Sequence, residues 1–195
     1  MRTIFPLQTN IISQIAAGEV IERPAYAVKE LVENALDADA TSITIAVEDA
    51  GLKRITVIDN GEGMSSEDLQ ESVKLHTTSK IKTIEGLEKI ATLGFRGEAL
   101  ASIASMSKLT IASKTKQDIQ GHVIEVIDGK KVSFTPIGMP VGTKVTVNNL
   151  FHSVPGRKKF LKSPRTEFRH IVDFVTGFAL AHPENRRRAA PETAR

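Results

Sequence analysis

With 195 residues, of which 41% are hydrophobic and 25% charged, the chain has the size and composition of one soluble globular domain, or of one domain with part of a neighbour. It has no cysteine, which excludes disulfides and thiolate metal sites, and neither a membrane-length apolar run nor a signal peptide, so we expect no membrane partner and a cytoplasmic location. The net charge is +3, and residues 150–182 hold six Lys or Arg against two Asp or Glu, which is typical of a phosphate-binding segment or of a solvated loop.

Two helices are predicted near the start of the chain. Thr9 and Asn10 can cap a first helix that runs to about Gly18. A second helix is predicted from Pro24, because a first helical turn does not use the N–H that proline lacks. Its apolar residues recur at helical spacing and predict a side that faces the core: Val28, Leu31, Val32, Ala35 and Leu36.

A strand pair and a third helix are predicted next. Residues 43–47 and 55–58 are rich in Ile and Val, and a tight turn at Ala50-Gly51 joins them. Ser65 and the acidic residues after it favour a helix that runs to Leu75. Residues 76–92 are polar with only brief apolar signals, so we expect a mobile segment there.

The second half of the chain indicates mainly strands. After a helix at residues 97–104, four strands are predicted, and Asp128-Gly129 turns one hairpin: residues 108–114, 122–127, 131–134 and 143–147. Residues 166–181 predict a last helix with one apolar side: Phe168, Ile171, Val172, Val175, Phe178 and Ala179. Residues 185–195 lack apolar periodicity and are expected to be disordered. This order predicts an α+β fold, a two-layer α/β sandwich with a mainly antiparallel mixed sheet.

Glu30 and Asn34 form the first of three polar groups that carry chemistry. They lie one helical turn apart, so their side chains share one face of the predicted helix. A solvated helix surface has the same composition. If a second layer covers that face, the Asn oxygen suits Mg²⁺ and the carboxylate can accept a proton from a water beside a phosphate.

The second group is the segment Asp59-Asn60-Gly61-Glu62-Gly63, which follows a predicted strand. A plain turn explains it equally well. A carboxylate held at a buried strand end would instead accept a hydrogen bond from the amine of adenine, and glycines would let the backbone approach a flat base. Further along, the hydroxyl of Thr143 could bond the base or Asp59, or Thr143 could simply favour the strand.

The third group precedes a predicted helix. Gly94 and Gly97 stand just ahead of the helix start, where backbone N–H groups and the helix dipole favour a phosphate. A helix cap with a flexible entry has the same glycines, and Arg96 is either a phosphate ligand or a surface ion-pair partner. The upstream segment Thr77-Thr78-Ser79-Lys80 offers hydroxyls and an ammonium to phosphates, or is a solvated loop.

Longer segments share the sequence pattern of one protein family. They are residues 14–20 (QIAAGEV), 23–24 (RP), 28–34 (VKELVEN), 36–38 (LDA), 94–102 (GFRGEALAS), 150–151 (LF) and 155–161 (PGRKKFL). With these segments the chain, from about Ile4 to about Ala181, resembles the GHKL ATPase superfamily and, within it, the MutL family of mismatch-repair proteins. The resemblance implies the GHKL (Bergerat) ATPase fold at residues 1–182 and a tail outside the family at 183–195.

The resemblance also implies residue roles. It makes Glu30 the general base and Asn34 the ligand of Mg²⁺, and it makes Asp59 the adenine-reading carboxylate. The implied ATP-binding residues are Asn34, Asp37, Asp59, Gly63, Met64, Thr78, Ser79, Lys80, Leu93, Gly94, Phe95, Arg96, Gly97, Glu98 and Thr143. The basic residues Arg157, Lys158, Lys159 and Lys162 are the implied DNA-backbone contacts.

The implied function is an Mg²⁺-dependent ATPase that couples mismatch recognition to strand excision through ATP-dependent dimerisation. Implied partners are mismatched double-stranded DNA, the mismatch-recognition protein MutS, a downstream nuclease or helicase, and a second copy in the full-length protein. The sequence departs from the family pattern in two ways. Gly156 stands where the family usually has Ala. The sequence also lacks the family's second subdomain, which supplies a γ-phosphate lysine, and its C-terminal dimerisation domain. We therefore expect this chain to bind ATP better than it hydrolyses it. Alternatives are a non-catalytic DNA-binding module or a topoisomerase- or chaperone-type GHKL ATPase.

Overall fold

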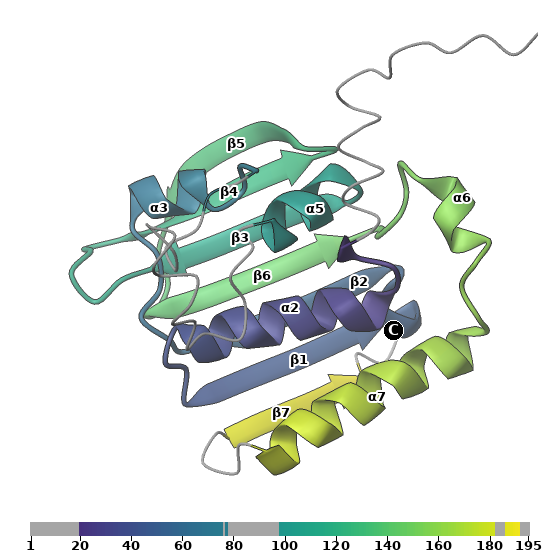
Figure 1. The fold of residues 1–195 in the computed structure, drawn as a ribbon. Coiled ribbons are helices and arrows are strands. Elements are labelled where there is room, and N and C mark those ends of the chain that lie inside the picture. Colours follow the sequence, from purple (N-terminus) through teal and green to yellow (C-terminus); the bar gives the residue numbers. More distant parts are fainter. Residues whose placement is uncertain (1–19, 76, 78–97, 182–185, 192–195) are drawn as a thin grey trace, which may run out of the picture.

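A seven-stranded sheet with helices on one side organises the protein in its computed structural model (Figure 1). The structure describes residues 20–75, 77, 98–181 and 186–191. The strand order is β5-β4-β3-β6-β2-β1-β7. All pairings are antiparallel except that of β1 with β7, which confirms the predicted mainly antiparallel mixed sheet. The predicted first helix at residues 9–18 and most of the segment at 76–92 lie outside the described residues.

Helix α2 (Pro24–Asp37) begins at the predicted proline and covers the middle of the sheet. The predicted apolar side is confirmed, because Val28, Leu31, Val32 and Ala35 are buried and Leu36 packs partly buried against the core. The chain leaves the helix at Ala38, whose N–H donates to the carbonyl of Asn34 over 3.1 Å. Burial of these side chains against the sheet is the main force that holds α2 in place.

The strands β1 (Ser42–Glu48) and β2 (Arg54–Asp59) form the predicted hairpin, joined by the short 3₁₀ helix η1 (Asp49–Gly51). β3 (Lys108–Lys114), β4 (Gly121–Ile127), β5 (Lys130–Ile137) and β6 (Gly142–Asn148) complete the antiparallel part. The turn at Asp128 and Gly129 has positive φ at both residues, as a two-residue hairpin requires. Strand register aligns one buried row across five strands: Ile45, Val57, Val145, Ile111 and Ile124.

Two short helices lie over the other half of the sheet. α3 (Ser66–Glu71) is capped by Ser65, whose hydroxyl accepts the N–H of Asp68 over 3.1 Å. The sequence predicts that this helix continues to Leu75, but it ends at Glu71 because the hydroxyls of Ser72 and Thr77 bond the carbonyls of its last turn. α5 (Ala99–Ser105) lies where a helix is predicted and buries Ile103 and Ala104.

The C-terminal elements depart further from the prediction. The four-residue helix α6 (Pro155–Lys158) is too short to produce a periodic signal. α7 (Pro164–Ala181) starts two residues before the predicted Thr166, since Ser163 caps it and proline suits a first turn. Its apolar side is not wholly buried: Phe168 and Val172 are 40% and 43% exposed, because α7 packs against α2 and η1 at the margin of the helical layer.

Strand β7 (Arg186–Pro191) lies within the tail that the sequence predicts to be disordered, so that prediction is wrong for these six residues. β7 pairs in parallel with β1, from Ser42 opposite Arg186 to Val47 opposite Pro191. An edge strand is held by backbone hydrogen bonds that almost any sequence can make, which is why no apolar periodicity marks it. Within the described residues, no helix is long and apolar enough to cross a lipid bilayer.

Candidate functional site

Three polar side chains meet at one end of the sheet. Asp59 at the end of β2 lies opposite Thr143 at the start of β6, and Thr143 lies opposite Ser113 near the end of β3. Each is two residues along its strand from a member of the buried apolar row, so all three lie on the helix-covered side. Strand pairing thus aligns a row of hydrogen-bonding groups next to the buried row of Val and Ile.

The Asp59 carboxylate is held by backbone N–H groups. Its Oδ1 accepts the N–H of Gly61 over 2.9 Å and that of Thr143 over 3.2 Å. Burial raises the pKa of the Asp59 carboxyl above its ordinary value, and these two hydrogen bonds offset that rise only in part. Among the described residues, no hydrogen bond reaches Oδ2. The second oxygen is therefore an acceptor that the described part of the chain does not use.

Glycines allow three close backbone contacts around Asp59. A Cβ on Gly61 would lie 2.5 Å from the carbonyl oxygen of Ala38, and one on Gly142 would lie 2.2 Å from that of Asp59. Gly63 has φ +73°, and a Cβ there would lie 2.1 Å from the carbonyl oxygen of Lys114. Real Cβ atoms essentially never come so close to other atoms, so the backbone around Asp59 needs glycine at these three positions.

The same loop is bonded to α2 and to β3. The N–H of Glu62 donates to the carbonyl of Ala38 over 2.9 Å, directly after the last turn of α2. The N–H of Met64 donates to Ser113 Oγ over 2.8 Å, and the half-buried Met64 side chain packs against the core. The loop is thereby fixed between the helix and the sheet, where the sequence predicts a nucleotide pocket.

Glu30, Asn34 and Asp37 on α2 are all half-buried rather than fully solvated. The Glu30 side chain is 25% exposed and lies 3.7 Å from Lys29 Nζ. Asn34 precedes Ala38 by one turn, so its helix face leads directly to the Asp59 loop. The structure therefore places the predicted catalytic and metal-binding residues on the helix that borders this loop.

Glu33 is a buried acid on α2 that the sequence analysis does not single out. Its carboxylate oxygens lie 3.1 and 3.2 Å from Lys29 Nζ. Burial raises the pKa of the Glu33 carboxyl, while the Lys29 ammonium lowers it. The sequence gives no sign that Glu33 is buried, since Glu33 is not part of the predicted apolar side of the helix.

Seven predicted phosphate and lid residues and Leu93 lie outside the described residues: Thr78, Ser79, Lys80, Leu93, Gly94, Phe95, Arg96 and Gly97. Glu98 is described and half-buried at the N-cap of α5, where its carbonyl accepts the N–H of Ser102 over 2.8 Å. The roles of the undescribed residues therefore stay predictions.

The predicted DNA-binding residues occupy a different region. Arg157 and Lys158 are on α6, and Lys159 and Lys162 follow it. α6 comes after the C-terminal end of β6, whereas Thr143 is near the start of that strand, and Figure 1 shows α6 beyond the end of the sheet that lies opposite the start of β6. Lys158, Lys159 and Lys162 are exposed. Within the described part of the chain, no ion pair neutralises any of the four.

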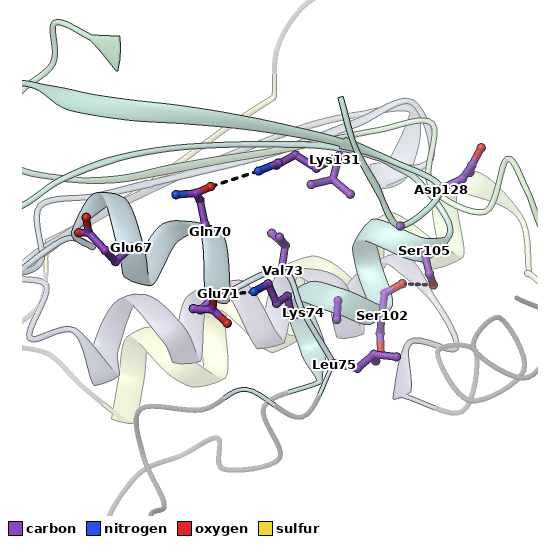
Figure 2. Close-up of a pocket in the computed structure, with 13 residues that line it drawn as sticks. Glu67, Gln70, Glu71, Val73, Lys74, Leu75, Ser102, Ser105, Asp128 and Lys131 are labelled. Atoms are coloured by element: carbon purple, nitrogen blue, oxygen red, sulfur yellow. Dashed lines mark hydrogen bonds and ion pairs between the residues drawn. The ribbon is translucent and has the colours of Figure 1, made fainter. Parts of the chain in front are cut away.

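A separate cavity of about 560 Å³ lies between α3, α5 and the β4–β5 hairpin (Figure 2). Among the described residues, no predicted site residue lines it. Its charged groups are of both signs, and several are engaged: Lys131 bonds Gln70 over 3.1 Å, and Asp128 pairs with His152 over 3.2 Å. The described residues that line the cavity do not form a catalytic set of side chains.

Comparison with known proteins identifies related sequences and structures. Residues 22–139 match the family described as Histidine kinase-, DNA gyrase B-, and HSP90-like ATPase. The DNA mismatch repair protein MutL of Streptococcus equi subsp. zooepidemicus (strain H70) is 53% identical over 184 residues, which are 94% of this chain and 28% of that protein. The chain thus spans 28% of the length of this relative.

Solved structures show the same fold. The Aquifex aeolicus MutL ATPase domain complexed with ADP superposes with a TM-score of 0.73 at 37% identity, covering 89% of this chain and 61% of that one. The N-terminal domain of a DNA repair protein superposes with a TM-score of 0.78 at 31% identity, covering 94% and 54%. These similarities confirm the predicted fold class and the predicted resemblance.

Proposed function

We propose that this chain, which belongs to the Histidine kinase-, DNA gyrase B-, and HSP90-like ATPase family, binds ATP as the nucleotide-binding part of a MutL-type mismatch-repair protein. One observation carries the proposal. The Asp59 carboxylate lies half-buried at a strand end with Oδ2 unused by the described residues, and Gly61, Gly63 and Gly142 allow close backbone contacts around it. That arrangement suits a flat base with an exocyclic amine, and the related Aquifex aeolicus domain was solved in complex with ADP.

The adenine end of the proposed pocket consists of Asp59, Gly63, Met64 and Thr143. Asp59 Oδ2 accepts the amine of adenine, because its Oδ1 already holds two N–H groups. Gly63 leaves room at the loop, since a side chain there would meet Lys114. Met64 is fixed through its N–H, and Thr143 adds a hydroxyl beside the carboxylate.

The phosphate end lies along α2. Asn34 offers the amide oxygen that a hard cation prefers, and Asp37, one turn after Glu33, adds a carboxylate on the same part of the helix. These donors fit Mg²⁺, which usually takes one or two protein oxygens together with phosphate oxygens. When bound, Mg²⁺ would neutralise part of the negative charge of the phosphates. Glu98 and the undescribed residues from Thr78 to Gly97 complete this end in the proposal.

Glu30 is the proposed general base. It takes a proton from the attacking water as the oxygen–phosphorus bond forms to the γ-phosphate and the bond to the β-phosphate oxygen breaks, which yields ADP and phosphate. A half-buried position suits this role, because a fully solvated carboxylate would not be held against one water. In the longer protein, slow hydrolysis and ATP-dependent dimerisation would couple mismatch recognition by MutS to strand excision by a nuclease or helicase.

Titration with ATP and Mg²⁺ tests the proposal. Wild type should bind, Asp59→Asn and Asn34→Ala should bind at least about tenfold more weakly, and Glu30→Ala should bind but not hydrolyse. Asp49→Asn is the matched control, since Asp49 is an exposed acid in η1 at the far end of β1 and β2. Equal ATP affinity in wild type and Asp59→Asn would contradict the adenine assignment.

A second candidate function is non-specific contact with the DNA backbone. Exposure of the basic residues after β6, without ion pairs in the described part of the chain, favours it. Reversing Lys158 and Lys159 to Glu should weaken binding of duplex DNA and flatten its dependence on salt, because fewer counterions are released. ATP affinity should not change, since these residues are remote from Asp59. An unaltered salt dependence would exclude this segment as the DNA contact.

A further inference from the structure

Ser113 is a buried serine that has no role in the proposed function. Its side chain is on the helix-covered side of β3, directly opposite Thr143 on β6. Ser113 is 1% exposed, so its hydroxyl must be satisfied within the protein. Leu109 and Ile111 occupy the same side of the strand, which makes Ser113 a polar residue in an apolar row.

Three polar atoms surround Ser113 Oγ. The N–H of Met64 donates to it over 2.8 Å. The carbonyl oxygen of Gly142 lies 3.2 Å away and can only accept, and Thr143 Oγ1 lies 2.8 Å away and can do either. Ser113 therefore links the Asp59 loop, through Met64, to the first two residues of β6.

Donor and acceptor counts fix the direction of the bond to Thr143. A serine hydroxyl has one proton and two lone pairs. If all three contacts are hydrogen bonds, the proton goes to Gly142, and the lone pairs accept from Met64 and Thr143. The Thr143 hydroxyl then donates to Ser113, so that Thr143 Oγ1 has only lone pairs left for anything else that approaches it.

We propose that Ser113 is a positioning residue that orients the Thr143 hydroxyl as an acceptor and thereby makes the site select a 6-amino purine over a 6-oxo purine. This inference rests on the proposed function, since it takes Asp59 and Thr143 as the residues that face the base. Asp59 Oδ2 and Thr143 Oγ1 are two acceptors on adjacent, directly paired strands.

Two adjacent acceptors discriminate by charge and by hydrogen bonding. A 6-amino group carries two N–H donors and suits both oxygens. A 6-oxo group is itself an acceptor, so at least one of the two site oxygens would face another lone pair. Because the partners of both oxygens are fixed, this mismatch would weaken the binding of a 6-oxo purine. Without Ser113, the Thr143 proton loses its acceptor, and the hydroxyl can rotate to donate to a 6-oxo group.

The test compares the affinities of ATP and inosine triphosphate, which differ only at the 6-position edge of the purine. Wild type should prefer ATP, and Ser113→Ala should reduce that preference by about tenfold, the effect expected from reversing one hydrogen bond. Ser107→Ala is the matched control: Ser107 is a fully buried serine whose hydroxyl donates to the carbonyl of Ile103 over 2.6 Å, away from the Asp59 loop. It should lower stability without altering the ratio of affinities.

Thr143→Val keeps the test decisive if Ser113→Ala does not fold. It should reduce the ATP preference by about tenfold, as Ser113→Ala does, and the double variant should reduce it no further than either single one, because both act through one hydroxyl. An unchanged ratio in Ser113→Ala, or in Thr143→Val, overturns the role of Ser113 while leaving ATP binding intact. Wild type that binds neither nucleotide overturns the proposed function and this inference with it.

Discussion

Replacing Gly63 with alanine should destabilise the protein and weaken ATP binding together. The φ of +73° at Gly63 is a left-handed conformation that costs a non-glycine residue about 1–2 kcal/mol. In addition, the new Cβ would lie 2.1 Å from the carbonyl oxygen of Lys114 and must move to at least 3.0 Å. Such a shift strains the adjacent bond from Met64 to Ser113, worth about 1 kcal/mol. We expect a total loss of about 2–4 kcal/mol in the free energy of unfolding.

Urea unfolding and ATP titration of Gly63→Ala measure the two effects. Gly156→Ala is the matched control, because a Cβ at Gly156 in α6 meets no atom within 4 Å. This control should be neutral or more stable by up to about 1 kcal/mol, since alanine reduces the entropy of the unfolded chain. If Gly63→Ala unfolds at the same urea concentration as wild type, the close contact with Lys114 does not exist as described.

Three other perturbations follow from the structure. Asp59→Asn should raise the free energy of unfolding at neutral pH while weakening ATP binding at least about tenfold. Burial raises the pKa of the folded Asp59 carboxyl, so wild type gains stability relative to the variant as pH falls through that raised pKa toward 3.8. In urea unfolding at several pH values, a stability difference that does not narrow on acidification would contradict this reasoning. Glu167→Ala should lower the free energy of unfolding by about 1–3 kcal/mol in thermal unfolding, because the buried Glu167 Oε1 accepts the N–H of Lys162 over 2.9 Å. Glu167→Gln should lose less, since a glutamine oxygen can accept the same N–H. Equal losses of stability in the two variants would refute that account. Leu69→Ala should cost about 2–5 kcal/mol in urea, since Leu69 is the fully buried anchor of α3, and a loss below 1 kcal/mol would show that α3 does not pack as described.

Local patterns in the sequence predict much of the fold because they reflect local physics. The start of α2 at Pro24 and the burial of Val28 and Leu31 follow from helix geometry and a 3.6-residue period. The hairpin at Asp128 and Gly129 follows from the positive φ that its turn requires. In each case the residues that decide the structure are neighbours in the chain.

The site depends instead on distant pairings. The bond from the N–H of Thr143 to Asp59 joins residues 84 positions apart, and no single-sequence pattern gives the register that aligns them. Ser113 left only a weak signal, a polar residue that continues the buried alternation of Leu109 and Ile111. Strand β7 left none, because its place depends on the open edge of β1. The roles of Glu30 and Asn34 came from family resemblance rather than from helix geometry.

A crystal structure of this chain with Mg²⁺ and a non-hydrolysable ATP analogue tests the central claim most directly. We predict that the adenine amine lies within hydrogen-bond distance of Asp59 Oδ2, with Gly63 and Thr143 beside the base and the phosphates along α2 near Asn34. A nucleotide bound elsewhere, for example in the cavity between α3 and α5, or an adenine that makes no contact with Asp59, would contradict the account.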